Sequence, residues 1–162
     1  MMVLVGQPGC GKSTFVEKYM GPNDDLIGTD KHIDRIAAQN KITYREAFDR
    51  DYPKAEKLME KDIKDLLEKK KKLGRINNHV FVDRTNLMVN SRKPWISLAN
   101  HLNMPCFAVL PIVEESLRKN RLKNREGKEI PDYALRGMLR RYKPPVMSEG
   151  FDGIIRLFEE EK

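Results

Sequence analysis

The chain has 162 residues and a formal net charge of +7, which fit one basic domain built around one core. The 40% apolar share argues against wholesale disorder, and no apolar run approaches the roughly 20 residues that a bilayer requires. Only two cysteines occur, Cys10 and Cys106, so we expect a reducing cytoplasmic setting with neither a disulfide framework nor a metal cluster. The basic balance admits a polyanionic partner without requiring one.

Strands and helices are expected to alternate along the chain. In order, the sequence predicts a strand over 2–5, a helix over 12–20, a strand over 26–27, helices over 31–39, 44–48 and 54–73, a strand over 80–82, a helix over 94–102, a strand over 106–110, helices over 114–125 and 131–142, and an edge strand over 154–158. The long helix is placed by apolar residues at three- and four-residue spacing, Gly74 is its expected C-cap, and Pro94 is expected in the first turn of its own helix. This alternation predicts an α/β fold in which a parallel sheet is flanked by helices.

The most specific motif follows the first strand. Gly6-Gln7-Pro8-Gly9-Cys10-Gly11-Lys12-Ser13 fits the pattern G-x-x-x-x-G-K-[ST]. Glycines allow the backbone N–H groups to turn inward around phosphates, and the next helix directs its N-terminus at the same charge. Lys12 is expected to reach the outer phosphates and the Ser13 hydroxyl to ligate Mg²⁺. The sequence therefore predicts ATP and Mg²⁺ as cofactors, held by Gly6, Gly9, Cys10, Gly11, Lys12, Ser13 and Thr14. Cys10 itself is interpreted as a small loop filler.

Two strand-end carboxylates favour transfer over hydrolysis. Asp83 follows the strand over 80–82 and is expected near the Mg²⁺, but the next residues, Arg84-Thr85-Asn86, include no glutamate to activate water. Asp30 follows the second strand, at the sheet edge that faces the ligand crevice. There its carboxylate can accept the proton of an attacking alcohol, a role compatible with capping the following helix.

An arginine-rich segment supplies further cations. Arg121 and Arg125 are four residues apart, so they are expected on one helical face, where guanidinium groups match the charge of a moving phosphoryl group. We expect a lid over about 114–130, hinged at Gly127. The alternative is an exposed basic helix.

Taken together, these residues resemble the 5′-hydroxyl polynucleotide kinases of phages and repair enzymes. The resemblance implies a single P-loop kinase domain over 1–162, with ATP entering one end and a nucleic-acid 5′-OH end the other. It implies that Asp30 is the general base and that Arg121 and Arg125 are the lid arginines.

The same resemblance places substrate residues on the acceptor side. It implies that the motif from Asp83 to Asn86, here with an inserted Arg84, helps to hold the acceptor. The family often has an arginine three residues after its base, where this chain has Ile33, and Arg35 is the nearest substitute. The predicted catalytic and substrate residues are Lys12, Asp30, Arg35, Arg84, Thr85, Asn86, Arg121 and Arg125, with Ser13 and Asp83 at the metal.

The C-terminal half also resembles the P-loop module of the heterogeneous nuclear ribonucleoprotein U family, through its strand-end Thr-Asn, its Pro131-led helix, Pro144-Pro145 and Glu149-Gly150-Phe151-Asp152. That resemblance implies a non-catalytic nucleotide- and RNA-binding module as one alternative. A small-molecule kinase acting on a nucleoside, sugar or antibiotic is another.

Overall fold

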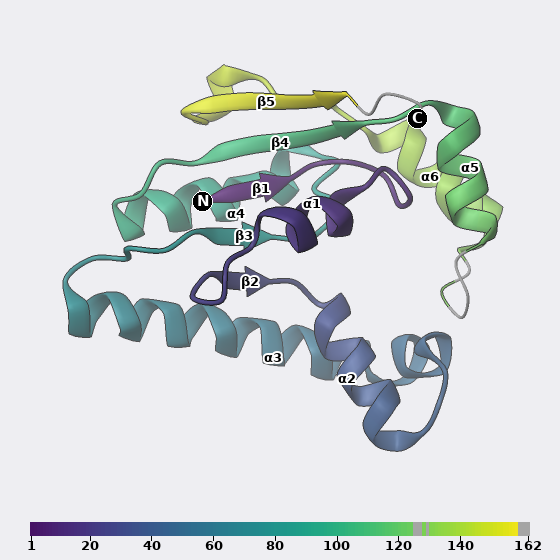
Figure 1. Ribbon diagram of the computed structural model, residues 1–162, viewed down its shortest axis with the longest axis horizontal. Coiled ribbons are helices and arrows are strands. Elements are labelled where there is room, and N and C mark those ends of the chain that lie inside the picture. Colours follow the sequence, from purple (N-terminus) through teal and green to yellow (C-terminus); the bar gives the residue numbers. More distant parts are fainter. Residues whose placement is uncertain (125–127, 129, 159–162) are drawn as a thin grey trace.

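The computed structural model describes residues 1–124, 128 and 130–158. Five parallel strands form one sheet in the order β2-β3-β1-β4-β5 (Figure 1). The strands are β1 (Met2–Leu4), β2 (Asp25–Ile27), β3 (Val80–Val82), β4 (Phe107–Ile112) and β5 (Gly153–Phe158). The predicted α/β fold with a parallel sheet is confirmed, and β5 lies at the edge as expected.

The register of the central strands aligns their carboxyl ends. Met2 pairs with both Phe81 and Phe107, and Ile27 pairs with Val82. The loops that follow β1, β2 and β3 therefore start side by side at one edge of the sheet. Parallel α/β sheets bind their ligands at this edge.

Helices cover both faces of the sheet. They are α1 (Lys12–Tyr19), α2 (Asp30–Asn40), α3 (Tyr44–Leu73), α4 (Val89–Leu102), α5 (Glu115–Lys123) and α6 (Asp132–Arg141), with a short 3₁₀ helix at Met147–Glu149. Alternate strand residues point to opposite sides. Val3 and Val5 pack with residues of α3 and α4, whereas Leu4 packs with Val16 of α1. None of the described helices is long and apolar enough to cross a membrane.

The region predicted as two helices, over 44–48 and 54–73, is one continuous helix. Thr43 and Glu46 form a reciprocal capping box at its start, and Gly74, with a φ of 73°, ends it as predicted. Pro53 lies inside and lacks the N–H for one helical hydrogen bond. Ala47 and Ala55, on either side of this proline, are both buried in a cluster with residues of α2. This packing holds α3 together across a residue that usually ends a helix.

Two other boundaries differ from the prediction because of local hydrogen bonding. Helix α4 begins at Val89 and not at Pro94, and the Ser91 hydroxyl bonds the Met88 backbone at its start. Strand β4 continues through Pro111 to Ile112. Phe107 donates to Met1 O on the β1 side, so position 111 faces the same side, beyond the end of β1. A proline there sacrifices no ladder hydrogen bond.

Candidate active site

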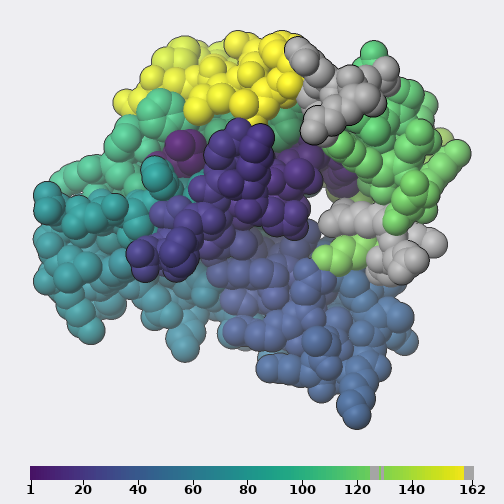
Figure 2. Space-filling model, in the orientation of Figure 1, coloured from purple at the N-terminus to yellow at the C-terminus, as the bar shows by residue number. Residues whose placement is uncertain are grey.

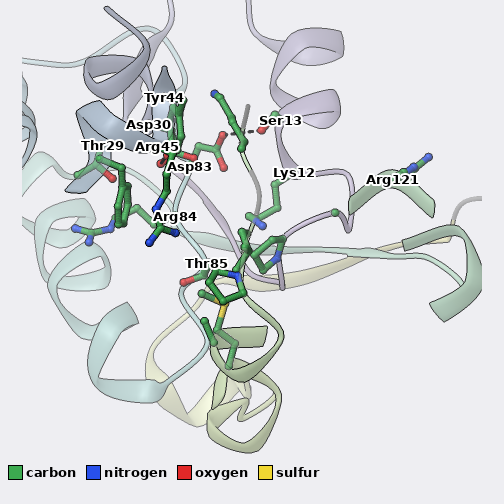
Figure 3. Close-up of a pocket in the computed structure, with 18 of the residues that line it drawn as sticks. Lys12, Ser13, Thr29, Asp30, Tyr44, Arg45, Asp83, Arg84, Thr85 and Arg121 are labelled. Atoms are coloured by element: carbon green, nitrogen blue, oxygen red, sulfur yellow. Dashed lines mark hydrogen bonds between the residues drawn. The ribbon is translucent and has the colours of Figure 1, made fainter. Parts of the chain in front are cut away.

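A pocket of about 680 Å³ opens at the carboxyl edge of the sheet. Its walls come from the phosphate loop (residues 6–13) and the start of α1, from Thr29 and Asp30, from the first turns of α3, from residues 83–85, and from the α5–α6 side. Figure 2 shows the molecule hollowed between the purple and blue N-terminal residues and the green residues of the α5–α6 side. Figure 3 shows the labelled side chains of this pocket.

The phosphate loop has the backbone that its glycines predict. Gly9 and Gly11 have φ angles of 82° and 95°, in the left-handed region, and Gly11 is the N-cap of α1. Lys12 Nζ donates to the carbonyl oxygens of Gly6 and Gln7, each at 2.9 Å. The amine is therefore held over the loop, at the N-terminus of α1, where an anion is favoured.

The predicted nucleotide-binding residues separate into two groups. Gly9, Gly11, Lys12, Ser13 and Thr14 line the pocket. The Cys10 side chain is buried under the loop, and a Cβ at Gly6 would lie only 2.5 Å from Cys10 Sγ. This arrangement supports the interpretation of Cys10 as a filler of the loop interior.

The phosphate loop also contacts α5 directly. A Cβ at Gly9 would lie 3.1 Å from Arg118 O and 3.1 Å from Leu122 Cγ. A hydrogen bond to Glu115 raises the pKa of Arg118, which keeps this guanidinium charged beside the loop. Gly9 therefore serves both the turn of the loop and the close approach of α5.

Ser13 and Asp83, the two predicted metal residues, are adjacent. The Ser13 hydroxyl donates to Asp83 Oδ2 at 3.2 Å, the contact dashed in Figure 3. A hydroxyl and a carboxylate are hard oxygen donors that suit Mg²⁺, which is often held by one or two carboxylates plus substrate phosphates. Among the described residues, no group of three or more acidic, histidine or cysteine side chains could hold a metal ion. A hydroxyl and a carboxylate are a donor set that fits an ion bound to nucleotide phosphates.

Asp30 is the first residue of α2, and Thr29 is the N-cap, so the sequence expectation that Asp30 caps a helix starting at residue 31 is wrong by one position. Its carboxylate lines the pocket and accepts a hydrogen bond from the Tyr44 hydroxyl at 3.0 Å. Figure 3 shows Asp30, Tyr44 and Asp83 gathered on one side of Lys12. The Asp30 carboxylate and the amine of Lys12 thus share one pocket.

The first turns of α3 form a pocket wall that the sequence analysis did not assign to the site. Tyr44, Phe48 and Tyr52, the α3 aromatic face, line the pocket together with Arg45 and Asp49. The available signal was their four-residue spacing, which places side chains on one helical face. The expected helix break before residue 54 concealed that spacing.

The strand-end motif divides between the pocket and the core. Arg84 lines the pocket, donates to the Tyr52 hydroxyl at 3.1 Å and lies 3.8 Å from Glu56. Burial raises the pKa of Tyr52, so its hydroxyl stays neutral beside the guanidinium. Thr85 also lines the pocket, and its carbonyl accepts from the Gly6 N–H at 3.0 Å.

Asn86 and Arg35 lie outside this wall. Asn86 is 2% exposed, donates to Leu4 O at 2.8 Å and accepts from Trp95 Nε1 at 3.0 Å. The resemblance to polynucleotide kinases predicts a substrate contact for Asn86, but both polar ends of this side chain bond groups of the core and hold the loop after β3 in place. Arg35 is exposed on α2, where its guanidinium lies 3.1 Å from His32 Nδ1, and it is not part of the pocket wall that the described residues form.

The arginine-rich segment reaches the pocket from α5. Arg121 lines the pocket, and Figure 3 shows it on the opposite side of Lys12 from Asp30 and Arg84. Lys128 Nζ lies 2.6 Å from Asp34 of α2 and 4.3 Å from the centre of the Tyr44 ring. Arg125 and Gly127, the predicted second arginine and hinge, lie outside the described residues. The expected lid over 114–130 is thus described only in part.

Known proteins share this fold and part of this sequence. The bifunctional polynucleotide phosphatase/kinase of Schizosaccharomyces pombe is 27% identical to this chain in an alignment of 164 residues. The alignment covers 95% of this chain and 32% of that protein. The chain thus spans about a third of that relative's length.

Two solved structures have the same fold at low sequence identity. Chaetomium thermophilum Kti12 in complex with ADP-AlF3 matches with a TM-score of 0.60 and 15% identity, over 99% of this chain and 90% of that one. A gluconokinase from Sinorhizobium meliloti matches with a TM-score of 0.54 and 17% identity, over 99% of this chain and 83% of that one. These likenesses show that the chain shares the overall fold of the two proteins.

A family model described as an AAA domain matches residues 1–145, which is most of the chain. The protein therefore belongs to this AAA domain family.

Proposed function

We propose that this protein transfers the γ-phosphoryl group of ATP to the 5′-hydroxyl of RNA or DNA. The observation that carries the proposal is the single pocket that joins the phosphate loop to Asp30. Transfer requires a phosphate-binding site and a proton acceptor within one cavity, and the shared lining of this pocket by Lys12 and Asp30 supports that arrangement. The name of the Schizosaccharomyces pombe relative, which includes a polynucleotide kinase, supports this choice of acceptor.

The donor side is the phosphate loop and its surroundings. Lys12 and the loop N–H groups bind the β- and γ-phosphates, and Ser13 and Asp83 would hold Mg²⁺. The ion would neutralise part of the phosphate charge. Arg121 faces the same pocket from α5, where its guanidinium stabilises charge on the transferred group. The resemblance to polynucleotide kinases assigns Arg125 the same role.

The acceptor side centres on Asp30. Its carboxylate takes the proton of the 5′-hydroxyl as the 5′ oxygen forms a bond to the γ-phosphorus. The bond between that phosphorus and the β–γ bridging oxygen breaks, and ADP leaves. The Tyr44 hydroxyl holds the carboxylate, and Arg84 and Thr85 lie on the acceptor wall.

The residues beside Asp83 favour an alcohol as the attacking group. Arg84 and Thr85 follow Asp83 where a hydrolase would usually carry a glutamate to activate water. Arg84 is instead held by Tyr52, as a fixed cation on the pocket wall. A fixed cation suits an acceptor that carries its own phosphates.

An acceptor screen tests the proposal. Label from γ-labelled ATP should appear on 5′-OH RNA or DNA, and less readily on nucleosides, 3′-mononucleotides or sugars. Asp30→Asn should lower the transfer rate by about 10²-fold or more while ATP binding is kept, because only the proton acceptor is lost. Asp65→Asn, at an exposed position of α3 away from the pocket, is the matched control.

Three results would contradict the proposal, each in a different way. An Asp30→Asn variant with the wild-type rate would remove the base from the mechanism. Efficient transfer to a small acceptor alone, with a flat salt response, would identify a small-molecule kinase, because polynucleotide binding weakens steeply with salt. ATP and RNA binding without transfer to any acceptor would identify a non-catalytic binding module.

A further inference from the structure

The α3 aromatic face carries an inference that rests on the proposed function and concerns what the acceptor side recognises. Its three rings repeat one helical turn apart and line the pocket. The Tyr44 and Phe48 ring centres are 6.1 Å apart, and those of Phe48 and Tyr52 are 5.0 Å apart. The face is thus a continuous aromatic surface beside Asp30.

The two outer rings have polar partners on the pocket wall. The Tyr44 hydroxyl donates to Asp30, and the Tyr52 hydroxyl accepts from Arg84. Both rings also pack against the buried cluster between α2 and α3. Their positions are therefore accounted for by the fold and by the groups that they hold.

Phe48, between them, differs in both respects. It has no polar group, and it is 37% exposed, whereas Tyr44 and Tyr52 are half-buried. Exposure of an apolar ring to water is unfavourable, so a ligand that covers the ring gains free energy from its burial. Tyr44 and Tyr52 lie one helical turn before and after Phe48, and the Phe48 side chain itself lines the pocket.

The neighbouring groups indicate the chemistry of what covers this ring. Arg45, which is ion-paired with Asp49, and Arg84 line the same wall, so the site pairs an aromatic surface with guanidinium groups. A nucleotide combines a planar base with phosphates, and bases stack favourably on aromatic side chains. A 5′-hydroxyl directed at Asp30 belongs to a nucleotide whose base is attached to the same sugar, so that base lies near Asp30 as well. Phe48 lies about one helical turn, roughly 6 Å along the axis, beyond the tyrosine that holds Asp30.

We propose that Phe48 is the stacking platform for the base of the terminal nucleotide, the one that carries the 5′-hydroxyl to be phosphorylated. Since phenylalanine offers only a ring and no hydrogen-bonding group, the platform accepts all four bases with little preference. It makes the acceptor subsite selective for a terminal nucleotide with a base over one without.

A binding cycle tests this platform independently of catalysis. The probe is a short 5′-OH oligonucleotide with 2-aminopurine at its 5′ terminus, whose fluorescence is quenched by stacking. The comparison probe is the same oligonucleotide with an abasic 5′ terminus. Its binding is measured with a dye placed far from that terminus. Phe48→Leu, which keeps an apolar side chain without the ring, should weaken binding of the first by about 5- to 100-fold and remove the quenching.

The abasic oligonucleotide should bind wild type more weakly by a similar factor, and Phe48→Leu should weaken it no further. Phe158→Leu, at a 72% exposed position of β5 outside the pocket, is the matched control and should change neither affinity. Affinity for ATP should be the same in all variants.

Equal weakening of both oligonucleotides by Phe48→Leu would show a merely structural role and overturn the proposal. Wild-type affinity and quenching in the variant, or no binding of either oligonucleotide to wild type, would overturn it as well. The proposed phosphoryl transfer fails by a different measurement, the absence of label on any 5′-OH acceptor. The two failures are therefore distinguishable.

Discussion

The Ser13 hydroxyl lies 3.2 Å from Asp83 Oδ2, which joins the first turn of α1 to the end of β3. The two residues are 70 positions apart in sequence, and the parallel register of β1 and β3 brings them together. Both oxygens are hard donors of the kind that Mg²⁺ prefers, and the proposed function assigns them to the ion.

Asp83→Asn should therefore raise the Mg²⁺ concentration needed for half-maximal ATP binding by about 10- to 100-fold, as loss of an ion-orienting carboxylate does in other sites. A fluorescent ATP analogue titrated with Mg²⁺ measures the shift. Asp65→Asn, on the exposed side of α3, should leave the curve where it is. An unchanged Mg²⁺ requirement in Asp83→Asn would exclude this carboxylate from the metal site.

Gly9→Ala should weaken nucleotide binding more than its backbone strain alone explains. Gly9 and Gly74 have similar positive φ angles, 82° and 73°, so alanine costs about 1–2 kcal/mol of strain at either. A Cβ at Gly9 would also press on Arg118 O, whereas around Gly74 nothing lies within 4 Å. Urea unfolding should thus show a similar or larger loss for Gly9→Ala, and only this variant should lose ATP affinity. Equal ATP affinity in the two variants would show that α5 yields without disturbing the loop.

Tyr44→Phe should lower the transfer rate without altering the fold. The ring and its contact with Lys128 remain, but the hydrogen bond to Asp30 is lost. A hydrogen bond to a charged group contributes about 1.5–3 kcal/mol at most in a buried setting, and less in an exposed one, so a fall of about 3- to 30-fold in kcat is expected. Single-turnover transfer with saturating acceptor measures it. Tyr19→Phe, at a 53% exposed position of α1, is the control. A rate equal to wild type would mean that Asp30 is oriented without this tyrosine.

Arg92 and Glu149 should determine part of the acid stability. Their side chains are 0% and 4% exposed and meet at 2.7 Å, and Arg92 also donates to Asn86 O and Lys143 O. Burial alone would raise the pKa of Glu149, but the hydrogen bonds from Arg92 and the Val146 N–H, with the charge of Arg92, bring it below its usual range. The folded state then binds fewer protons than the unfolded state near this carboxyl. Its contribution is present above about pH 4.3 and is lost as the pH falls through the lower, folded-state pKa.

Glu149→Gln should therefore flatten the decline in unfolding free energy below about pH 4.3, measured by urea titration at several pH values. Arg92→Leu should cost about 3–5 kcal/mol at neutral pH, because it leaves a buried carboxylate unpaired. Arg75→Leu, at an exposed site, should stay within about 0.5 kcal/mol of wild type. An Arg92→Leu variant as stable as this control would rule out a stabilising role for the pair.

The donor side of the site was predictable because its signals are local. The glycines and Lys12 of the phosphate loop specify a backbone shape and a charge within eight consecutive residues. Asp30 and Asp83 required one additional rule, that parallel strands end at a common edge. The pocket wall formed by α3 was harder to predict from the sequence, because Pro53 indicates a helix break that packing against α2 overrides. Asn86 shows the opposite case, since a polar residue in a functional motif is used by the core.

The α/β fold, the phosphate loop and the two strand-end carboxylates could be predicted from local sequence patterns. Spacing and turn chemistry act over a few residues, and strand–helix alternation permits few arrangements. The packing of separate elements was needed to show that α3 is continuous and that its aromatic face lines the pocket. The same packing brings Tyr44 to Asp30 and Tyr52 to Arg84. Those contacts join residues that are 14 and 32 positions apart, and they depend on how α2 and α3 pack. No local pattern specifies that packing, because it is the sum of many weak apolar contacts between separate elements.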